Sequence, residues 1–114
     1  MKNAIRLFAL FIIAVFLANP AAIKSGSNTC PSSGNKTVSS TNIRAIQVIV
    51  MGTSGNTGKV YVGGPTVTTS EGIYLNAGDT INFATQGNAS AYDLSNIYFA
   101  CTVSGDSIGF TYVQ

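Results

Sequence analysis

Few side chains in this 114-residue sequence could carry out chemistry. Histidine is absent, which excludes Ser-His-Asp catalysis, Cys-His catalysis and His-ligated metal sites. Glu71, Asp79 and Asp106 each stand beside a glycine, as is typical of turns in which a short polar side chain caps the backbone. The remaining acidic residue, Asp93, falls in a longer predicted loop. We therefore expect no catalytic residues and no enzyme activity.

The acidic residues also lack the spacing of a dedicated metal site. There is no alternating D-x-D pattern, although a calcium site built from loop carboxylates is an alternative. Residues 52–59 (GTSGNTGK) look like a phosphate-binding loop, but Thr53 replaces the first glycine and Val60 stands where Ser or Thr would bind magnesium. We interpret this stretch as a hairpin loop, and we predict no metal, no cofactor and no small-molecule substrate.

The two cysteines, Cys30 and Cys101, could form a disulfide. It would close a loop of about 70 residues and stabilise the fold by about 4 kcal/mol on the chain-entropy model. The alternative is a free, buried Cys101 that packs as a small hydrophobe. The sequence alone leaves both alternatives open.

The tyrosines could form a sugar-binding surface. Packing at the edge of a β domain or at an interface is the more common role of this amphipathic side chain. The five residues are Tyr61, Tyr74, Tyr92, Tyr98 and Tyr112.

Composition excludes some classes of protein. Only 9% of the residues are charged, against about 25% in an average soluble protein. The net charge is +2. This charge is too small for a nucleic-acid surface, which needs clustered Lys and Arg, so we expect no nucleic-acid partner. Disorder of the whole chain is excluded because 46% of the residues are hydrophobic.

Residues 1–24 form a hydrophobic N-terminal segment, predicted as a helix. Lys2 and Arg6 precede an uninterrupted apolar run over residues 7–18, which as a helix would reach only about 18 Å of a bilayer core about 30 Å thick. Three interpretations stay open: a cleaved signal peptide, which would remove residues 1–22, a membrane anchor in contact with lipid through residues 4–23, or a helix buried among other subunits. The anchoring side chains would be Leu7, Phe8, Leu10, Phe11, Ile12, Ile13, Val15, Phe16 and Leu17.

The rest of the chain divides into a linker and a β domain. Residues 25–42 are rich in Ser, Thr, Asn and Gly and predict a flexible tether. Residues 43–114 alternate apolar and polar side chains in about seven short strands separated by turn residues. The fold class is therefore all-β, and we expect a small antiparallel β-sandwich, jelly-roll-like, with strands over residues 44–51, 59–62, 66–70, 73–75, 80–84, 97–103 and 108–113.

A β domain of this size has a thin core and usually needs a staple or a partner. The predicted strand over residues 44–51 is apolar on nearly both faces, which suits a central strand or one that lies against another subunit. We therefore expect oligomerisation through an interface that includes Ile46, Val48, Val50, Tyr61, Tyr74 and Tyr98.

Four short blocks of the sequence carry a resemblance. They are residues 59–63 (KVYVG), 67–69 (VTT), 72–79 (GIYLNAGD) and 97–101 (IYFAC). This rhythm of strands and turns resembles small β-rich structural proteins of bacteriophage virions. The resemblance implies a non-enzymatic role in capsid decoration, a head fibre, a spike or a minor capsid position, with the chain itself and other virion shell proteins as partners and the virion as location. The alternative is a secreted or membrane-anchored bacterial surface module, adhesin-like and glycan-binding.

Overall fold

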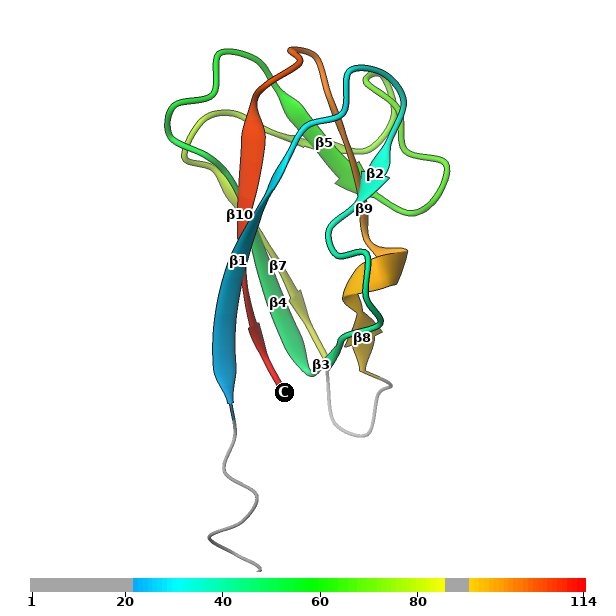
Figure 1. The fold of residues 1–114 in the computed structure, drawn as a ribbon, viewed down its shortest axis with the longest axis vertical. Helices are drawn as coiled ribbons and strands as arrows, with labels where there is room; N and C mark the ends of the chain where they lie inside the picture. Colours follow the sequence, from blue (N-terminus) through cyan, green and yellow to red (C-terminus); the bar gives the residue numbers. More distant parts are fainter. Residues whose placement is uncertain (1–21, 86–90) are drawn as a thin grey trace, which may run out of the picture.

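The computed structural model describes residues 22–85 and 91–114. The described chain is all-β, as predicted, and every paired strand is antiparallel to its neighbour (Figure 1). The first sheet has the order β1 (Ile23–Thr29), β10 (Ser107–Val113), β4 (Gln47–Gly52) and β7 (Thr80–Ala84). The second has the order β2 (Lys36–Thr37), β9 (Tyr98–Cys101), β5 (Val60–Gly63) and β6 (Ile73–Leu75). A two-stranded sheet of β3 (Arg44–Ala45) and β8 (Tyr92–Asp93) precedes the 3-10 helix η1 (Leu94–Asn96).

The strands of the two main sheets are paired in a nested order. The first strand along the chain, β1, pairs with the last, β10, and the second, β2, pairs with β9. Further inside, β4 pairs with β7, and β5 with β6. The chain is therefore an antiparallel ribbon that folds back at the connection between β5 and β6 and distributes its paired strands over two sheets.

The core lies between the two sheets and follows from alternation along each strand. Val48 and Val50 of the first sheet are fully buried, while Ile49 and Met51 between and after them point outward. Val60, Val62 and Phe99 of the second sheet belong to the same buried cluster. Successive side chains of a strand point to opposite faces, so one half of each strand fills the core and the other half faces outward.

The prediction of a flexible linker over residues 25–42 is wrong. Its first residues belong to β1, which pairs with β10 over its whole length, and Val38 is 1% exposed. The amide of Asn28 donates to the carbonyls of Thr37 and Val38, both at 3.2 Å, and so ties β1 to the chain of the second sheet. Polar residues can form this strand because its backbone hydrogen bonds, rather than buried apolar side chains, hold it in place.

Gly26 shows why the polar composition of β1 was misleading. A Cβ atom at this position would lie 2.6 Å from Cζ of Phe110, on the neighbouring strand. Any larger residue would push the ring of Phe110 aside, because the phenyl ring occupies the space that a Cβ atom would take. The glycine that suggested a tether instead allows close packing between two strands.

The domain boundaries shift accordingly. The β domain already includes β1, well before residue 43, and the predicted N-terminal segment ends too late, since Ile23 and Lys24 belong to β1. The anchoring residues Leu7 to Leu17 and the predicted helix lie outside the described residues. Among the residues that are described, no helix has the length and apolar character needed to cross a membrane.

Three predicted strands and one predicted loop need correction. The strand predicted over residues 97–103 is shorter, since β9 ends at Cys101. The strand predicted over residues 44–51 is divided at Ile46, because β3 pairs with β8 while β4 belongs to the first sheet. Residues 66–70 form no strand, only an isolated bridge between Thr68 and Glu71. The loop predicted over residues 85–95 contains β8 and η1.

Candidate interaction surfaces

A disulfide joins the two sheets. Cys30 follows β1 in the first sheet, Cys101 ends β9 in the second, and their Cα atoms lie 5.9 Å apart. This is the first of the two alternatives that the sequence left open. Cys30 is buried among the core residues, so the covalent bond closes one end of the sandwich from inside.

The structure separates the predicted interface residues into two groups. Val48 and Val50 are fully buried in the core of their own chain, so their assignment to an interface was wrong. Their side chains point between the sheets because they alternate with Ile49 and Met51 along β4. The others reach the surface: Ile46 and Tyr74 are exposed, and Tyr61 and Tyr98 are half-buried.

The outward face of the first sheet, here called the neutral face, is built from all four strands of that sheet. Cross-strand partners share a face of a sheet, and the outward rows contain Thr111 beside Ile49 and Gly109 beside Met51. None of its members carries a charge. They are Ile23, Ser25, Ser27, Gln47, Ile49, Met51, Thr80, Asn82, Ala84, Gly109, Thr111 and Val113.

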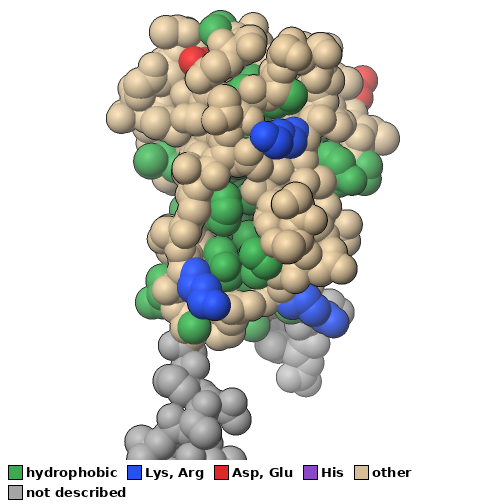
Figure 2. Space-filling view, in the orientation of Figure 1, with side chains coloured by type: hydrophobic (Ala, Val, Ile, Leu, Met, Phe, Trp, Pro, Cys, Tyr) green, Lys and Arg blue, Asp and Glu red, His purple; other side chains and the backbone are tan. Residues whose placement is uncertain are grey.

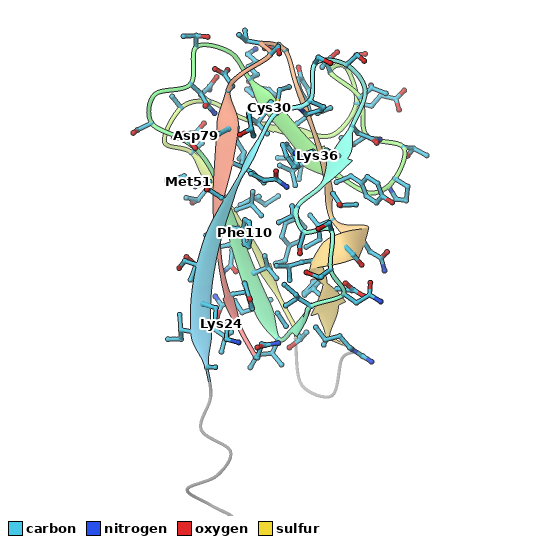
Figure 3. All side chains as sticks on the ribbon, viewed as in Figure 1. Lys24, Cys30, Lys36, Met51, Asp79 and Phe110 are labelled. Atoms are coloured by element: carbon cyan, nitrogen blue, oxygen red, sulfur yellow. A yellow bond between two sulfur atoms is a disulfide. The ribbon has the colours of Figure 1, made fainter. Side chains whose placement is uncertain are left out.

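A shallow groove of about 270 Å³ runs over the neutral face. Gly109 lines it and contributes no side chain, while Ile49 and Met51 stand beside it, each 36% exposed. Figure 3 shows Met51 on the side of the first sheet away from the second. An uncharged sheet surface with exposed apolar side chains can be covered by a protein partner without stripping water from charged groups.

A second, smaller surface contains two aromatic rings beside a lysine. The rings of Tyr61 on β5 and Tyr74 on β6 have centroids 5.8 Å apart, and Nζ of Lys59 lies 4.4 Å from the centroid of Tyr74. Tyr74 is 49% exposed. Exposed tyrosine and a nearby cation can stack on and hydrogen-bond a polar ring such as a sugar.

The carboxylates act as acceptors for the backbone. Asp106 is 7% exposed, and its oxygens accept from the amides of Gly58 at 2.8 Å and Thr57 at 3.1 Å. Asp79 accepts from the amide of Asn76 at 3.0 Å. The predicted capping of its own turn is therefore confirmed for Asp79, whereas Asp106 holds the backbone of a different loop, over residues 52–59.

Asp93 caps η1 by accepting from the hydroxyl of Ser95 at 2.7 Å and from its amide at 2.9 Å. Hydrogen bonds from the Ser95 side chain, then from its backbone, lower the pKa of Asp93, because they stabilise the charged carboxylate. Arg44 lies opposite Asp93 in the small sheet and acts in the same direction.

The glycine-rich loop over residues 52–59 is held down by side chains of the chain itself. The amide nitrogen of Asn56 donates to the carbonyl of Ser107 at 2.8 Å, and its oxygen accepts from the amide of Ser107 at 2.8 Å. These two bonds are made by the side chain of Asn56, while the backbone amides of Thr57 and Gly58 are taken up by Asp106. Within residues 22–85 and 91–114, no three His, Cys, Asp or Glu residues come together as a metal site.

The neutral face is the surface that sequence reasoning missed. Its signal was present, because residues 44–51 are apolar on nearly both faces, but alternation does not say which face is buried. Comparisons of this chain with protein-family models, with curated proteins and with solved structures find no match.

Proposed function

We propose that this chain is a non-enzymatic virion structural protein, a capsid decoration, minor capsid, fibre or spike component. Its β head packs with copies of itself and with other shell proteins through the neutral face. The observation that carries the proposal is this uncharged sheet surface with Ile49 and Met51 exposed on a disulfide-closed sandwich.

The strand order supports the proposal at the level of fold. Two four-stranded antiparallel sheets with β1 beside β10 and β2 beside β9 agree with the jelly-roll architecture, which is built from eight strands. Jelly rolls occur in viral capsid proteins and in lectins. One fold serves many functions, so the fold alone does not distinguish these roles. The neutral face supports the structural role.

The point at which β1 begins suits attachment to a shell. β1 begins at Ile23, so the apolar residues that we propose as an anchor are followed directly by the first sheet rather than by a long tether. The described chain enters the domain at the end of the sandwich where the C-terminus also lies (Figure 1). The opposite end, with the disulfide and the loop over residues 52–59, would then face away from the anchor.

Mass spectrometry of purified virus particles tests the proposal. Peptides of this chain recovered in many copies per particle, with residues 22–114 intact, would support it. Recovery only from the bacterial envelope or the culture medium would contradict it and favour the second candidate.

Charge placed on the neutral face should weaken packing. We expect the double variant Ile49→Lys/Met51→Lys of the full chain, kept in a mild non-ionic detergent, to have a lower mass by sedimentation velocity than the wild type, because lysines would have to lose water at the interface. The matched control is Ile73→Lys, an exposed isoleucine on the second sheet, which should keep the wild-type mass. Equal masses for all three proteins would remove the neutral face from the proposal.

A secreted or membrane-anchored bacterial surface module that binds glycans is the second candidate. Tyr61, Tyr74 and Lys59 favour it, because they form an exposed aromatic and cationic surface. The disulfide agrees with export as well as with a virion surface. Glycan-array binding that is lost in Tyr74→Ala and kept in Ile49→Lys would favour this function over the first.

A further inference from the structure

We propose that the free edge of β1 pairs with β1 of a second copy of this chain, so that the two first sheets continue as one eight-stranded sheet. The inference rests on the proposed function and adds to it a second contact between copies, at the edge of the sheet, beside the packing through the neutral face. Within the described chain, β1 is an edge strand that pairs with β10 on one side only. Figure 1 shows β1 at the front of the sandwich, with its other side unpaired.

The pairing with β10 determines which backbone groups of β1 remain free. The amide of Gln114 donates to the carbonyl of Ala22, and the amide of Cys30 donates to the carbonyl of Asp106, in the same register as β1 and β10. Hydrogen-bonded residues alternate along an antiparallel strand, so the even-numbered residues face β10. The odd-numbered residues, from Ile23 to Thr29, direct their amides and carbonyls to the free edge.

An independent contact agrees with this assignment. Nζ of Lys36 donates to the carbonyl of Thr29 at 3.3 Å, so this oxygen does point away from β10. The bond uses one of two lone pairs on the carbonyl and leaves the other available. The amides and carbonyls of Ser25 and Ser27 lie in the middle of the free edge.

The centre of this edge carries little of the usual protection against strand pairing. Natural edge strands are often blocked by proline, bulges or inward-pointing charges. Here the central residues Ser25, Gly26 and Ser27 are small and uncharged, and the one charged residue of β1, Lys24, lies near its start. A second strand can therefore approach closely.

The sequence of β1 complements itself about Gly26. In an antiparallel pair centred there, Ser25 of one copy lies opposite Ser27 of the other, and each such pair exchanges two backbone hydrogen bonds. Lys24 then lies opposite Asn28 of the second copy, so no two lysines face each other. This symmetry favours a second copy over an unrelated strand as the partner.

The pairing would also cover an incompletely buried part of the core. Figure 3 shows Phe110 beside β1, between Lys24 and Cys30, and its ring lies against Gly26. Figure 2 shows apolar side chains exposed in the space between β1 and the chain of the second sheet. A second copy centred on Gly26 would shield this side of the sandwich from water.

The eight-stranded sheet would provide the area that a stable interface needs and that one neutral face lacks. From strand spacing and rise, one neutral face measures about 400 Å² in plan, whereas a stable interface needs about 800 Å² on each partner. A two-fold axis perpendicular to the sheet keeps both neutral faces on the same side, where together they reach that area. The β1 pair is thus the unit that would pack, through its joined neutral faces, against further copies and other shell proteins.

Proline at the free amides tests the inference. In the full-length protein in non-ionic detergent, Ser25→Pro/Ser27→Pro removes two outward amides and leaves the bonds to β10, so we expect the mass by sedimentation velocity to fall twofold or more. The control Ser25→Ala/Ser27→Ala keeps both amides and should keep the wild-type mass. Near-ultraviolet circular dichroism verifies that each variant is folded.

Amide hydrogen exchange of the wild-type protein provides a test that needs no variant. We expect the amides of Ser25 and Ser27 to exchange at least about 100-fold more slowly than unprotected amides. Fast exchange at these two residues beside slow exchange at Gly26 and Asn28 would overturn the inference. A wild-type oligomer whose mass is unchanged by the prolines would also overturn it while leaving self-packing intact, and a wild-type monomer would overturn both.

Discussion

At the scale of single residues, substitution of Asp106 should destabilise the folded protein. Its buried carboxylate holds the loop over residues 52–59 through the amides of Thr57 and Gly58. In Asp106→Ala these two amides lose their acceptor, and bonds to a charged group contribute about 1.5–3 kcal/mol each at most. We expect the free energy of unfolding to fall by about 3 kcal/mol, measured by urea denaturation.

Asp79→Ala is the matched control for that prediction. Asp79 also accepts one backbone amide in a turn, but the bond is exposed to water, which can replace the lost acceptor. A loss below about 1 kcal/mol is expected. Similar losses for the two variants would mean that burial of the Asp106 carboxylate is unimportant.

At the scale of elements, the disulfide decides how firmly β1 is attached. It links the end of β1 to the end of β9 across a sequence separation of 71 residues. On the chain-entropy model a loop of this length stabilises the folded state by about 4 kcal/mol. We expect Cys30→Ala/Cys101→Ala to lose about this much free energy of unfolding in urea.

The response to a reductant distinguishes the contribution of the disulfide bond to stability from the contribution of cysteine packing. Dithiothreitol should destabilise the wild type by a similar amount and leave the double variant unaffected. Hydrogen exchange should accelerate first in β1, because Asn28 and the β10 pairing are then its remaining attachments. A wild type that is indifferent to reductant would contradict the stabilising role.

At the scale of the whole molecule, the nested pairing makes the two ends of the domain depend on each other. The first strands, β1 and β2, pair with β10 and β9. A fragment of residues 43–114 would lack both strands, Cys30 and the buried Val38. We expect a fragment of residues 22–114 to fold, and the shorter one to remain unfolded, as judged by the dispersion of amide signals in NMR spectra.

The control is the longer fragment measured both oxidised and reduced. It shows how much of the effect in the shorter fragment comes from the missing disulfide rather than from the missing strands. If the 43–114 fragment gave dispersed spectra, the domain would begin where the sequence first suggested, and β1 would be an accessory strand.

Local sequence determined the strands that alternate clearly. β5, β6, β7 and β10 lie within one residue of the positions that apolar alternation predicted. The all-β class and the role of Asp79 in its turn also follow from neighbouring residues, because turn chemistry is local. The partners of Asp106, the amides of Thr57 and Gly58, are nearly 50 residues away, and only the tertiary structure brings them to it. For Cys30 and Cys101, the sequence left two alternatives open, and the disulfide was one of them.

Tertiary structure alone decided the remainder. The polar β1 is a strand because β10 supplies its hydrogen bonds, and nothing within residues 23–29 signals a partner so distant in the sequence. The pattern of β4 shows that Val50 and Met51 point in opposite directions, but the position of the second sheet decides which of them is buried. The same physical reason hid the neutral face: alternation specifies two sides of a strand, and only packing chooses the one that meets water.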